Sequence, residues 1–153
     1  NPEAVKRIYD IKKRADNKSM LVLLDDAGKI ASYADVPDIA LDLIEVADKP
    51  TTIIYPGAKR LAPNLIAEDG TIGIRITREE FTRSLIFRYN KPIVSTSANI
   101  SGEPSPHFFG EISEEIKNAV DYIVDYRRND HNPAAPSSII KLGMGGEIQI
   151  IRK

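Results

Sequence analysis

The run Met20-Leu21-Val22-Leu23-Leu24 is the longest uninterrupted apolar stretch of the chain. Polar and turn-forming residues bound it, with Asn17 before it and Asp25-Asp26-Ala27-Gly28 after it. A short apolar run between such signals is typical of a strand that is covered on both faces. A bilayer span needs about 20 apolar residues, so this run is far too short to be one. It therefore predicts an interior strand of an α/β domain.

Helix signals stand on both sides of this strand. Asn1 as N-cap, Pro2 at the first helical position and Glu3 in the first turn predict a helix start, and apolar residues follow at helical spacing. A second helix is expected over residues 38–47. It should end before Pro50, because a proline disfavours helical backbone at the residue that precedes it. The predicted strand thus lies between two amphipathic helices.

Downstream, strand patterns alternate with further helices. Thr51–Tyr55 is rich in β-branched residues, and in Thr71-Ile72-Gly73-Ile74-Arg75-Ile76 the isoleucines alternate with small or polar residues. Arg75 is therefore expected on the face opposite a buried row. The other expected elements are a helix after a capping box of Thr77 and Glu80, a strand over 92–96, a helix from near Ser113, a strand over 122–126, and a hairpin of 137–142 and 147–152 joined by Gly143-Met144-Gly145-Gly146. This order predicts one α/β domain with a sheet of mixed direction.

Composition excludes several classes of function. The 153 residues contain no Cys and only His107 and His131, which excludes disulfide scaffolds, Fe–S clusters, zinc fingers and thiol catalysis. Lys and Arg number 21 against 22 Asp and Glu, so the surface is not committed as a whole to nucleic acid. Residues 1–18 nevertheless hold six basic and three acidic side chains. They form either a solvated helix face or a local basic patch.

A polar loop follows the strand expected at 92–96. Ser95-Thr96-Ser97-Ala98-Asn99-Ile100-Ser101-Gly102 carries four hydroxyls and one amide in eight positions. Such a loop at a strand end either binds an anion or nucleotide or is a simple polar turn. Ser97 does not fit a serine hydrolase, because no G-x-S-x-G elbow surrounds it and neither histidine has a triad spacing.

Four cations are expected near a cleft: Lys12, Arg14, Arg75 and Arg152. Arg75 and Arg152 are predicted on strands, where a guanidinium can hold an anion in a fixed orientation. For each of them a surface salt bridge is the alternative interpretation. The residues alone therefore predict an anion or nucleotide site made of Lys, Arg, Ser and Asn.

Five elements, in order along essentially the whole chain, resemble the YrdC/Sua5 family of threonylcarbamoyl-AMP synthases. They are Ile11-Lys12-Lys13-Arg14, Gly73-Ile74-Arg75, the loop Ser95–Gly102, Pro136-Ser137-Ser138-Ile139-Ile140 and Ile150-Ile151-Arg152. The resemblance implies a YrdC-like twisted sheet, parallel and antiparallel, flanked by helices and closed by a C-terminal hairpin.

The resemblance also implies an activity. The enzyme would be a nucleotidyltransferase that joins L-threonine, bicarbonate and ATP, carried with Mg²⁺, into threonylcarbamoyl-AMP and pyrophosphate. Other enzymes then use this adenylate to form t6A at adenosine 37 of tRNAs that read codons beginning with A. A cytoplasmic enzyme without a membrane segment or a metal site of its own is implied, with tRNA or proteins of the same pathway as candidate partners.

The family signatures fall on six residues of this sequence. Lys-x-Arg matches Lys12 and Arg14, which are expected to act in catalysis by holding the phosphates and the carboxylate of threonine. Ser97, Asn99 and Ser137 are expected to bind the nucleotide phosphate and its surroundings, and Arg152 to close the cleft. Threonine, bicarbonate and triphosphate are all anionic, so cations must neutralise them before any bond forms.

The sequence also departs from the family pattern. A Pro-Thr-x-Thr-x-Tyr-Gly-Leu-like strand and turn, part of the family's threonine site, is not found in residues 1–153, so a single domain lacking that strand is expected. Lys18-Ser19-Met20 replaces Lys-Pro-Leu, Lys49-Pro50-Thr51-Thr52 replaces Pro-Gly-Pro-x-Thr, and Ser138 replaces Thr. These changes leave the amino-acid substrate less defined than ATP.

Two alternatives to the synthase stay open from the sequence. One is a non-catalytic module that binds double-stranded RNA, suggested by the basic residues of 1–18. The other is a carbamoyl-phosphate-linked domain of the kind fused in hydrogenase maturation factors.

Overall fold

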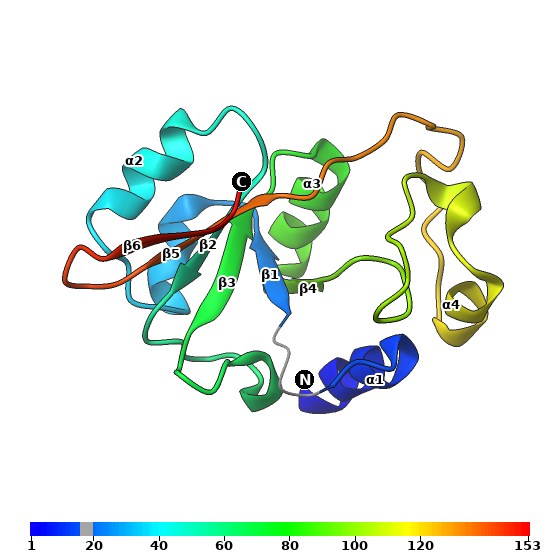
Figure 1. The fold of residues 1–153 in the computed structure, drawn as a ribbon, viewed down its shortest axis with the longest axis horizontal. Helices are drawn as coiled ribbons and strands as arrows, with labels where there is room; N and C mark the ends of the chain where they lie inside the picture. The colour runs from blue at the N-terminus through cyan, green and yellow to red at the C-terminus, as the bar shows by residue number, and fades with distance from the viewer. Residues whose placement is uncertain (16–19) are drawn as a thin grey trace.

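A computed structural model describes residues 1–15 and 20–153. Residues 16–19, which include Lys18 of the basic segment and most of the Lys18-Ser19-Met20 departure, lie outside the described residues. The α-helices are α1 (Pro2–Lys12), α2 (Ile39–Val46), α3 (Glu80–Tyr89) and α4 (Glu114–Ala119). The strands are β1 (Leu21–Leu24), β2 (Thr51–Tyr55), β3 (Ile72–Ile76), β4 (Ile93–Ser95), β5 (Ser138–Leu142) and β6 (Ile148–Arg152). Three short 3₁₀ helices are η1 (Ala27–Ser32), η2 (Pro63–Leu65) and η3 (Phe109–Glu111) (Figure 1).

The strands form one six-stranded sheet in the order β4-β1-β3-β2-β5-β6. Strand β1 runs parallel to β3, and β2 runs parallel to β5, whereas the other neighbours are antiparallel. The predicted α/β sheet of mixed direction, with a closing hairpin, is therefore confirmed. The apolar run at 20–24 becomes β1, an interior strand between β4 and β3, as its composition predicts.

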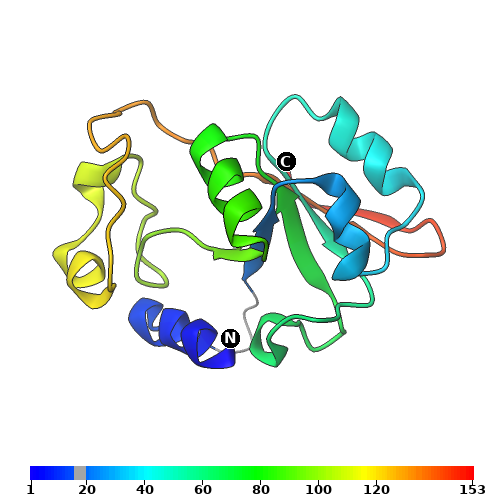
Figure 2. The same cartoon turned by 180° about the vertical axis from the view of Figure 1, so that it is seen from behind.

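Helices cover one face of this sheet. Seen from behind, α2, α3 and η1 lie in front of the strands (Figure 2). The side chains that point to this face form the hydrophobic core, and all are at most 2% exposed: Val22, Leu24, Ile53, Ile72 and Ile74. Ile30 of η1 and Ala40 of α2 pack against them and are fully buried. Burying these chains stabilises the fold by roughly 1.5–3 kcal/mol for each large side chain.

Helix α1 begins where its capping residue predicts. The Asn1 side chain accepts a hydrogen bond from the Ala4 amide at 3.1 Å, and Pro2 occupies the first turn. The Tyr9 side chain is only 1% exposed, and its hydroxyl donates a hydrogen bond of 3.1 Å to the carbonyl of Asn64 in η2. Lys13 ends the helix with φ of +51°, in the left-handed region. This anchored helix brings its last turn, with Lys12, toward the loop after β4.

Two expectations for the later elements were wrong. The start of α3 is capped by Glu79, whose carboxylate accepts from the amides of Phe81 and Thr82, rather than by a box of Thr77 and Glu80. Residues 122–126 form no strand, because no neighbouring strand pairs with them in the described part of the chain. Tyr126 instead stacks on Phe81, with ring centroids 4.8 Å apart.

No helix in residues 1–15 and 20–153 has the length and apolar character that a bilayer crossing requires.

Candidate active site

Strand register decides which side chains reach the face that the helices leave uncovered. Thr52 lies opposite Arg75 and beside Ile139, and Gly73 lies beside Leu21. Since side chains alternate along a strand, these five positions share one face, opposite the isoleucines of the core. The alternation at 71–76 therefore places Arg75 as predicted, on the face opposite the buried row.

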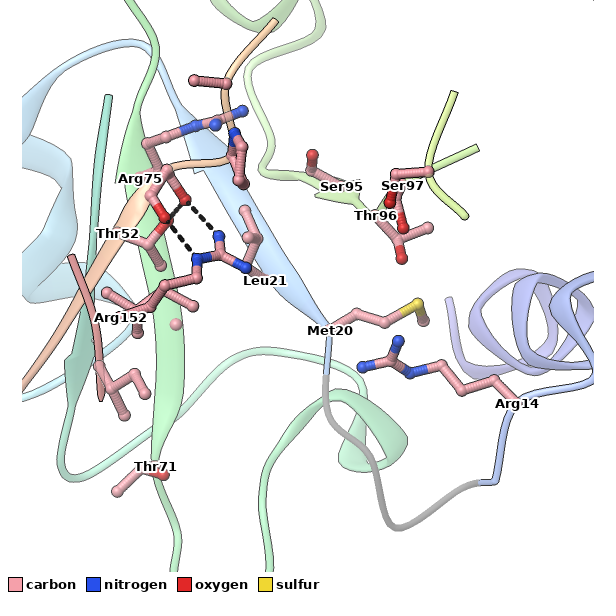
Figure 3. A pocket seen from close by; sticks show the side chains of 17 residues that line it. Arg14, Met20, Leu21, Thr52, Thr71, Arg75, Ser95, Thr96, Ser97 and Arg152 are labelled. Carbon is pink, nitrogen blue, oxygen red and sulfur yellow. Dashed lines mark hydrogen bonds between the residues drawn. The ribbon is translucent and has the colours of Figure 1, made fainter. Parts of the chain in front are cut away.

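A cavity of about 460 Å³ opens on this face. Its cations are Arg14, Arg75 and Arg152; Arg75 and Arg152 rise from the sheet, and Arg14 reaches toward them from beyond the end of α1 (Figure 3). Seven residues with hydroxyl groups also line it: Thr52, Thr71, Ser95, Thr96, Ser97, Ser105 and Ser137. Within the described ranges no Asp or Glu contributes to the wall. The cavity is therefore positive and rich in hydrogen-bond donors, which suits an anion.

Arg152 is fixed by neutral acceptors. Its Nε donates to the carbonyl of Ser137 at 2.8 Å, and Nη2 lies 3.5 Å from the Ser137 hydroxyl. That hydroxyl in turn shares a hydrogen bond of 2.8 Å with Thr52 Oγ1. The guanidinium thus has a defined orientation, and no carboxylate of residues 1–15 or 20–153 forms an ion pair with it.

Lys12 is bound beneath the loop that follows β4. Its side chain is buried, and Nζ donates to the carbonyls of Ser97 at 2.5 Å and Asn99 at 2.7 Å. The Lys12 carbonyl accepts from the Ser101 amide at 2.8 Å, which ties the same loop to α1 a second time. Burial lowers the pKa of Lys12, and the charge of Arg14 lowers it further. Lys12 therefore shapes the loop, and its ammonium does not form part of the cavity wall.

Arg75 is a half-buried cation at the centre of the sheet. Burial lowers the pKa of its guanidinium from the ordinary value. Among the described residues, none places a carboxylate or another acceptor within hydrogen-bonding distance of it. A partly desolvated charge without a partner is costly, and an anion in the cavity would offset that cost.

The six residues predicted from the sequence converge on one region. Arg14, Ser97, Ser137 and Arg152 line the cavity, whereas Lys12 and Asn99 hold the loop from behind. Sequence reasoning missed the part played by Thr52, Thr71, Ser105 and Gly73 in the wall. Thr52 and Gly73 could have been found, because each alternates with core residues along its strand and therefore points to the opposite face. The sequence did not show which strands pair, so it did not show that these two residues meet at one cavity.

Metal-binding side chains do not gather here. In the part of the chain that the structure describes, no group of three His, Asp or Glu residues could hold a metal ion. The cations and hydroxyls suit phosphate and carboxylate oxygens instead.

Known proteins resemble this chain in sequence and in fold. A family model of Sua5, YciO and YrdC proteins, described as "Telomere recombination", matches residues 1–153. A protein of Methanocaldococcus jannaschii, provisionally named threonylcarbamoyl-AMP synthase, is 38% identical over 143 residues, covering 93% of this chain and 66% of the relative. A threonylcarbamoyl-AMP synthase of Pseudoalteromonas translucida is 28% identical over 152 residues, covering 97% and 80% of the two chains.

A solved structure shares the fold. The chain superposes on P. abyssi Sua5 complexed with L-threonine with a TM-score of 0.79 and 25% identity, covering 93% of this chain and 42% of that one. The chain thus spans about two thirds of the M. jannaschii relative and less than half of the Sua5 chain.

Proposed function

Because the chain belongs to the Sua5/YciO/YrdC family, we propose that it is the catalytic domain of a threonylcarbamoyl-AMP synthase acting in tRNA modification. The reaction is a nucleotidyl transfer that consumes L-threonine, bicarbonate and ATP and releases pyrophosphate. The observation that carries the proposal is the cavity of about 460 Å³, lined by three arginines and seven hydroxyl-bearing residues and by no carboxylate from the described ranges. Its volume lies within the usual size of small-molecule sites.

The chemistry requires two bond-forming steps. The amine nitrogen of threonine attacks the carbon of bicarbonate, water leaves, and a carbamate forms. A carbamate oxygen then attacks the α-phosphorus of ATP, the bond to the β-phosphate oxygen breaks, and pyrophosphate leaves. Neither step needs a nucleophile from the protein, so positioning and stabilisation of negative charge carry the catalysis.

The residues of the site fall into groups according to the part of the reactants, or of the protein, that each would contact. Arg14, Arg75 and Arg152 face the cavity and would neutralise the triphosphate and the threonine carboxylate. The hydroxyls of Ser97 and Ser137 would donate to phosphate oxygens. Mg²⁺ would enter as part of the ATP complex, since triphosphate oxygens are its preferred ligands. Lys12 would act through the loop that it binds.

The experiment is an adenylate assay with ATP labelled at the α-phosphate. The purified full-length protein is mixed with L-threonine, bicarbonate and Mg²⁺, and AMP-linked product and pyrophosphate are measured. We expect product only when threonine and bicarbonate are both present. Matched reactions that lack one of the two substrates are the controls, and serine replaces threonine in a further reaction to test the amino-acid specificity.

Other outcomes would overturn the proposal. Folded protein that forms no AMP-linked product would refute the synthase. Product formed only when carbamoyl phosphate replaces bicarbonate would favour the domain type found in hydrogenase maturation factors. Tight RNA binding with a steep salt dependence and no product would favour the RNA-binding module.

The surface argues against that module. Of the basic side chains of 1–18, Lys6 pairs with Asp10 and Lys13 with Glu115, each at 2.7 Å. Arg7 pairs with Asp121 at 2.7 Å, and Lys12 is buried. Cations that are paired with carboxylates attract a phosphate backbone only weakly.

A further inference from the structure

We infer that Thr52 is a positioning residue for this reaction. Its hydroxyl fixes Ser137, and Ser137 fixes the guanidinium of Arg152 at the cavity. The inference rests on the proposed function, because it assigns Arg152 to the anionic reactants. Thr52 itself would touch no reacting atom.

Burial and distance support the first link. Thr52 is 2% exposed and Ser137 is 4% exposed, and their hydroxyl oxygens lie 2.8 Å apart. At this separation one of the two buried hydroxyls donates a hydrogen bond to the other. No other side-chain polar atom among the described residues lies in hydrogen-bonding range of Thr52 Oγ1. The Thr52 hydroxyl therefore has Ser137 as its side-chain hydrogen-bond partner.

The second link runs from Ser137 to Arg152. The Ser137 carbonyl accepts from Arg152 Nε at 2.8 Å, and the Ser137 hydroxyl lies 3.5 Å from Nη2. Both bonds face the same edge of the guanidinium, so they fix its plane as well as its position (Figure 3). A change in the rotamer of Ser137 would remove the second contact and loosen the plane.

Strand pairing explains why Thr52 can do this. Strands β2 and β5 are parallel, with Thr51 opposite Ser138, and the Ser138 amide donates to the Pro50 carbonyl at 3.0 Å. The backbone of Ser137 is thereby held beside Thr52 on the cavity face. Thr51 points to the other face, where its hydroxyl donates to the Lys49 carbonyl.

A first experiment reads the geometry without the reaction. Thr52→Val keeps the shape of the side chain and removes the hydroxyl, Thr52→Ser keeps the hydroxyl, and Thr51→Val is the matched control. In ¹⁵N-labelled protein the Nη2–H signals of Arg152, assigned with Arg152→Gln, report solvent exchange at the atom that contacts the Ser137 hydroxyl. We expect exchange roughly fivefold or more faster in Thr52→Val, as for the loss of one buried hydrogen bond, and unchanged in the other two variants. Equal exchange in Thr52→Val and the parent protein would overturn the inference.

A second experiment reads the reaction. In the adenylate assay kcat/KM should fall about fivefold to a hundredfold in Thr52→Val, recover in Thr52→Ser and stay unchanged in Thr51→Val. In an Arg152→Gln background Thr52→Val should cost little more, because the two residues act through one contact. Full additivity of the two losses would refute the link to Arg152. If the parent protein makes no adenylate, the proposed function fails. The exchange measurement then decides by itself whether Thr52 positions the Arg152 guanidinium. Urea unfolding of each variant shows that folded protein is being compared.

Discussion

Replacing Lys12 with Met tests whether this lysine acts on the loop or on the substrate. Methionine keeps the length and apolar stem of the side chain and removes the ammonium. In the structure that ammonium is 2.5 Å from the Ser97 carbonyl and 2.7 Å from the Asn99 carbonyl, and the residue is 3% exposed. The change therefore removes the side-chain donor that binds the loop, whereas the backbone bond from the Ser101 amide remains.

The size of the effect follows from two opposing contributions. Hydrogen bonds from a charged donor contribute about 1.5–3 kcal/mol each, so two of them give roughly 3–6 kcal/mol. Burial of the ammonium opposes this, and the lowered pKa of Lys12 has that burial as its main cause. Ser97 is exposed, so water can replace part of what its carbonyl loses. We expect a net loss of about 2 kcal/mol in the free energy of unfolding, or roughly 4–8 °C in Tm for a chain of this size.

The assay combines urea unfolding, limited proteolysis within residues 96–106 and adenylate formation. Lys13→Met is the matched control, because Lys13 is exposed and makes a surface pair with Glu115 that contributes at most about 1 kcal/mol. We expect Lys12→Met to lose stability, loop protection and activity together, and Lys13→Met to retain all three. Loss of activity at unchanged stability and unchanged proteolysis would refute the reasoning and place the ammonium on the substrate.

Three further changes test the cavity and one surface salt bridge. A Cβ atom added at Gly73 would lie 3.4 Å from its nearest neighbours, so Gly73→Ala should fit. The methyl groups of Gly73→Val should fill the cavity and raise the Kd for ATP about tenfold, measured by calorimetry. Equal Kd values for the parent protein and Gly73→Val would exclude the cavity as the ATP site. Arg75→Met should weaken ATP binding and leave urea stability unchanged or higher, because it removes a half-buried charge that has no partner among the described residues; a clear loss of stability would contradict this. The hydrogen bond from Lys141 lowers the pKa of Asp69 from 3.8 to about 2, so its stabilisation is present above pH 4 and is lost as the pH falls toward 2. Because both groups are half-exposed, Asp69→Asn should remove under about 1 kcal/mol at pH 5 and only a small part of that at pH 2, measured as urea stability against pH.

The sheet could be predicted because its strands carry local signals. The solid run at 20–24 and the alternating isoleucines at 71–76 became β1 and β3, and the closing hairpin formed at Gly143–Gly146. The strand expected at 122–126 did not form, although Tyr122-Ile123-Val124 is a run of β-forming residues. A strand needs a partner for its backbone groups, and the composition of one segment does not show whether that partner is present.

The site was harder to predict than the sheet, for a similar reason. Lys12, Ser97 and Asn99 were assigned to one site by family signatures, but no local pattern shows that the lysine binds the loop carbonyls. Burial of an ammonium depends on how α1 docks, which is a tertiary property. Thr52 was overlooked because its neighbour Ser137 is 85 residues away and is brought beside it only by the pairing of β2 and β5.

Arg152 differs from the surface cations Lys6 and Arg7 in the kind of partner that it has, and the difference bears on function. On the outer surface Lys6 and Arg7 pair with carboxylates, which cancel their charge. At the cavity Arg152 is held by the carbonyl oxygen of Ser137, which sets direction without adding negative charge. Arg75 projects into the same cavity from β3. A site that must gather several anions needs cations that are oriented before the anions arrive and still carry their full charge. Neutral acceptors meet both requirements, whereas a carboxylate would meet only the first.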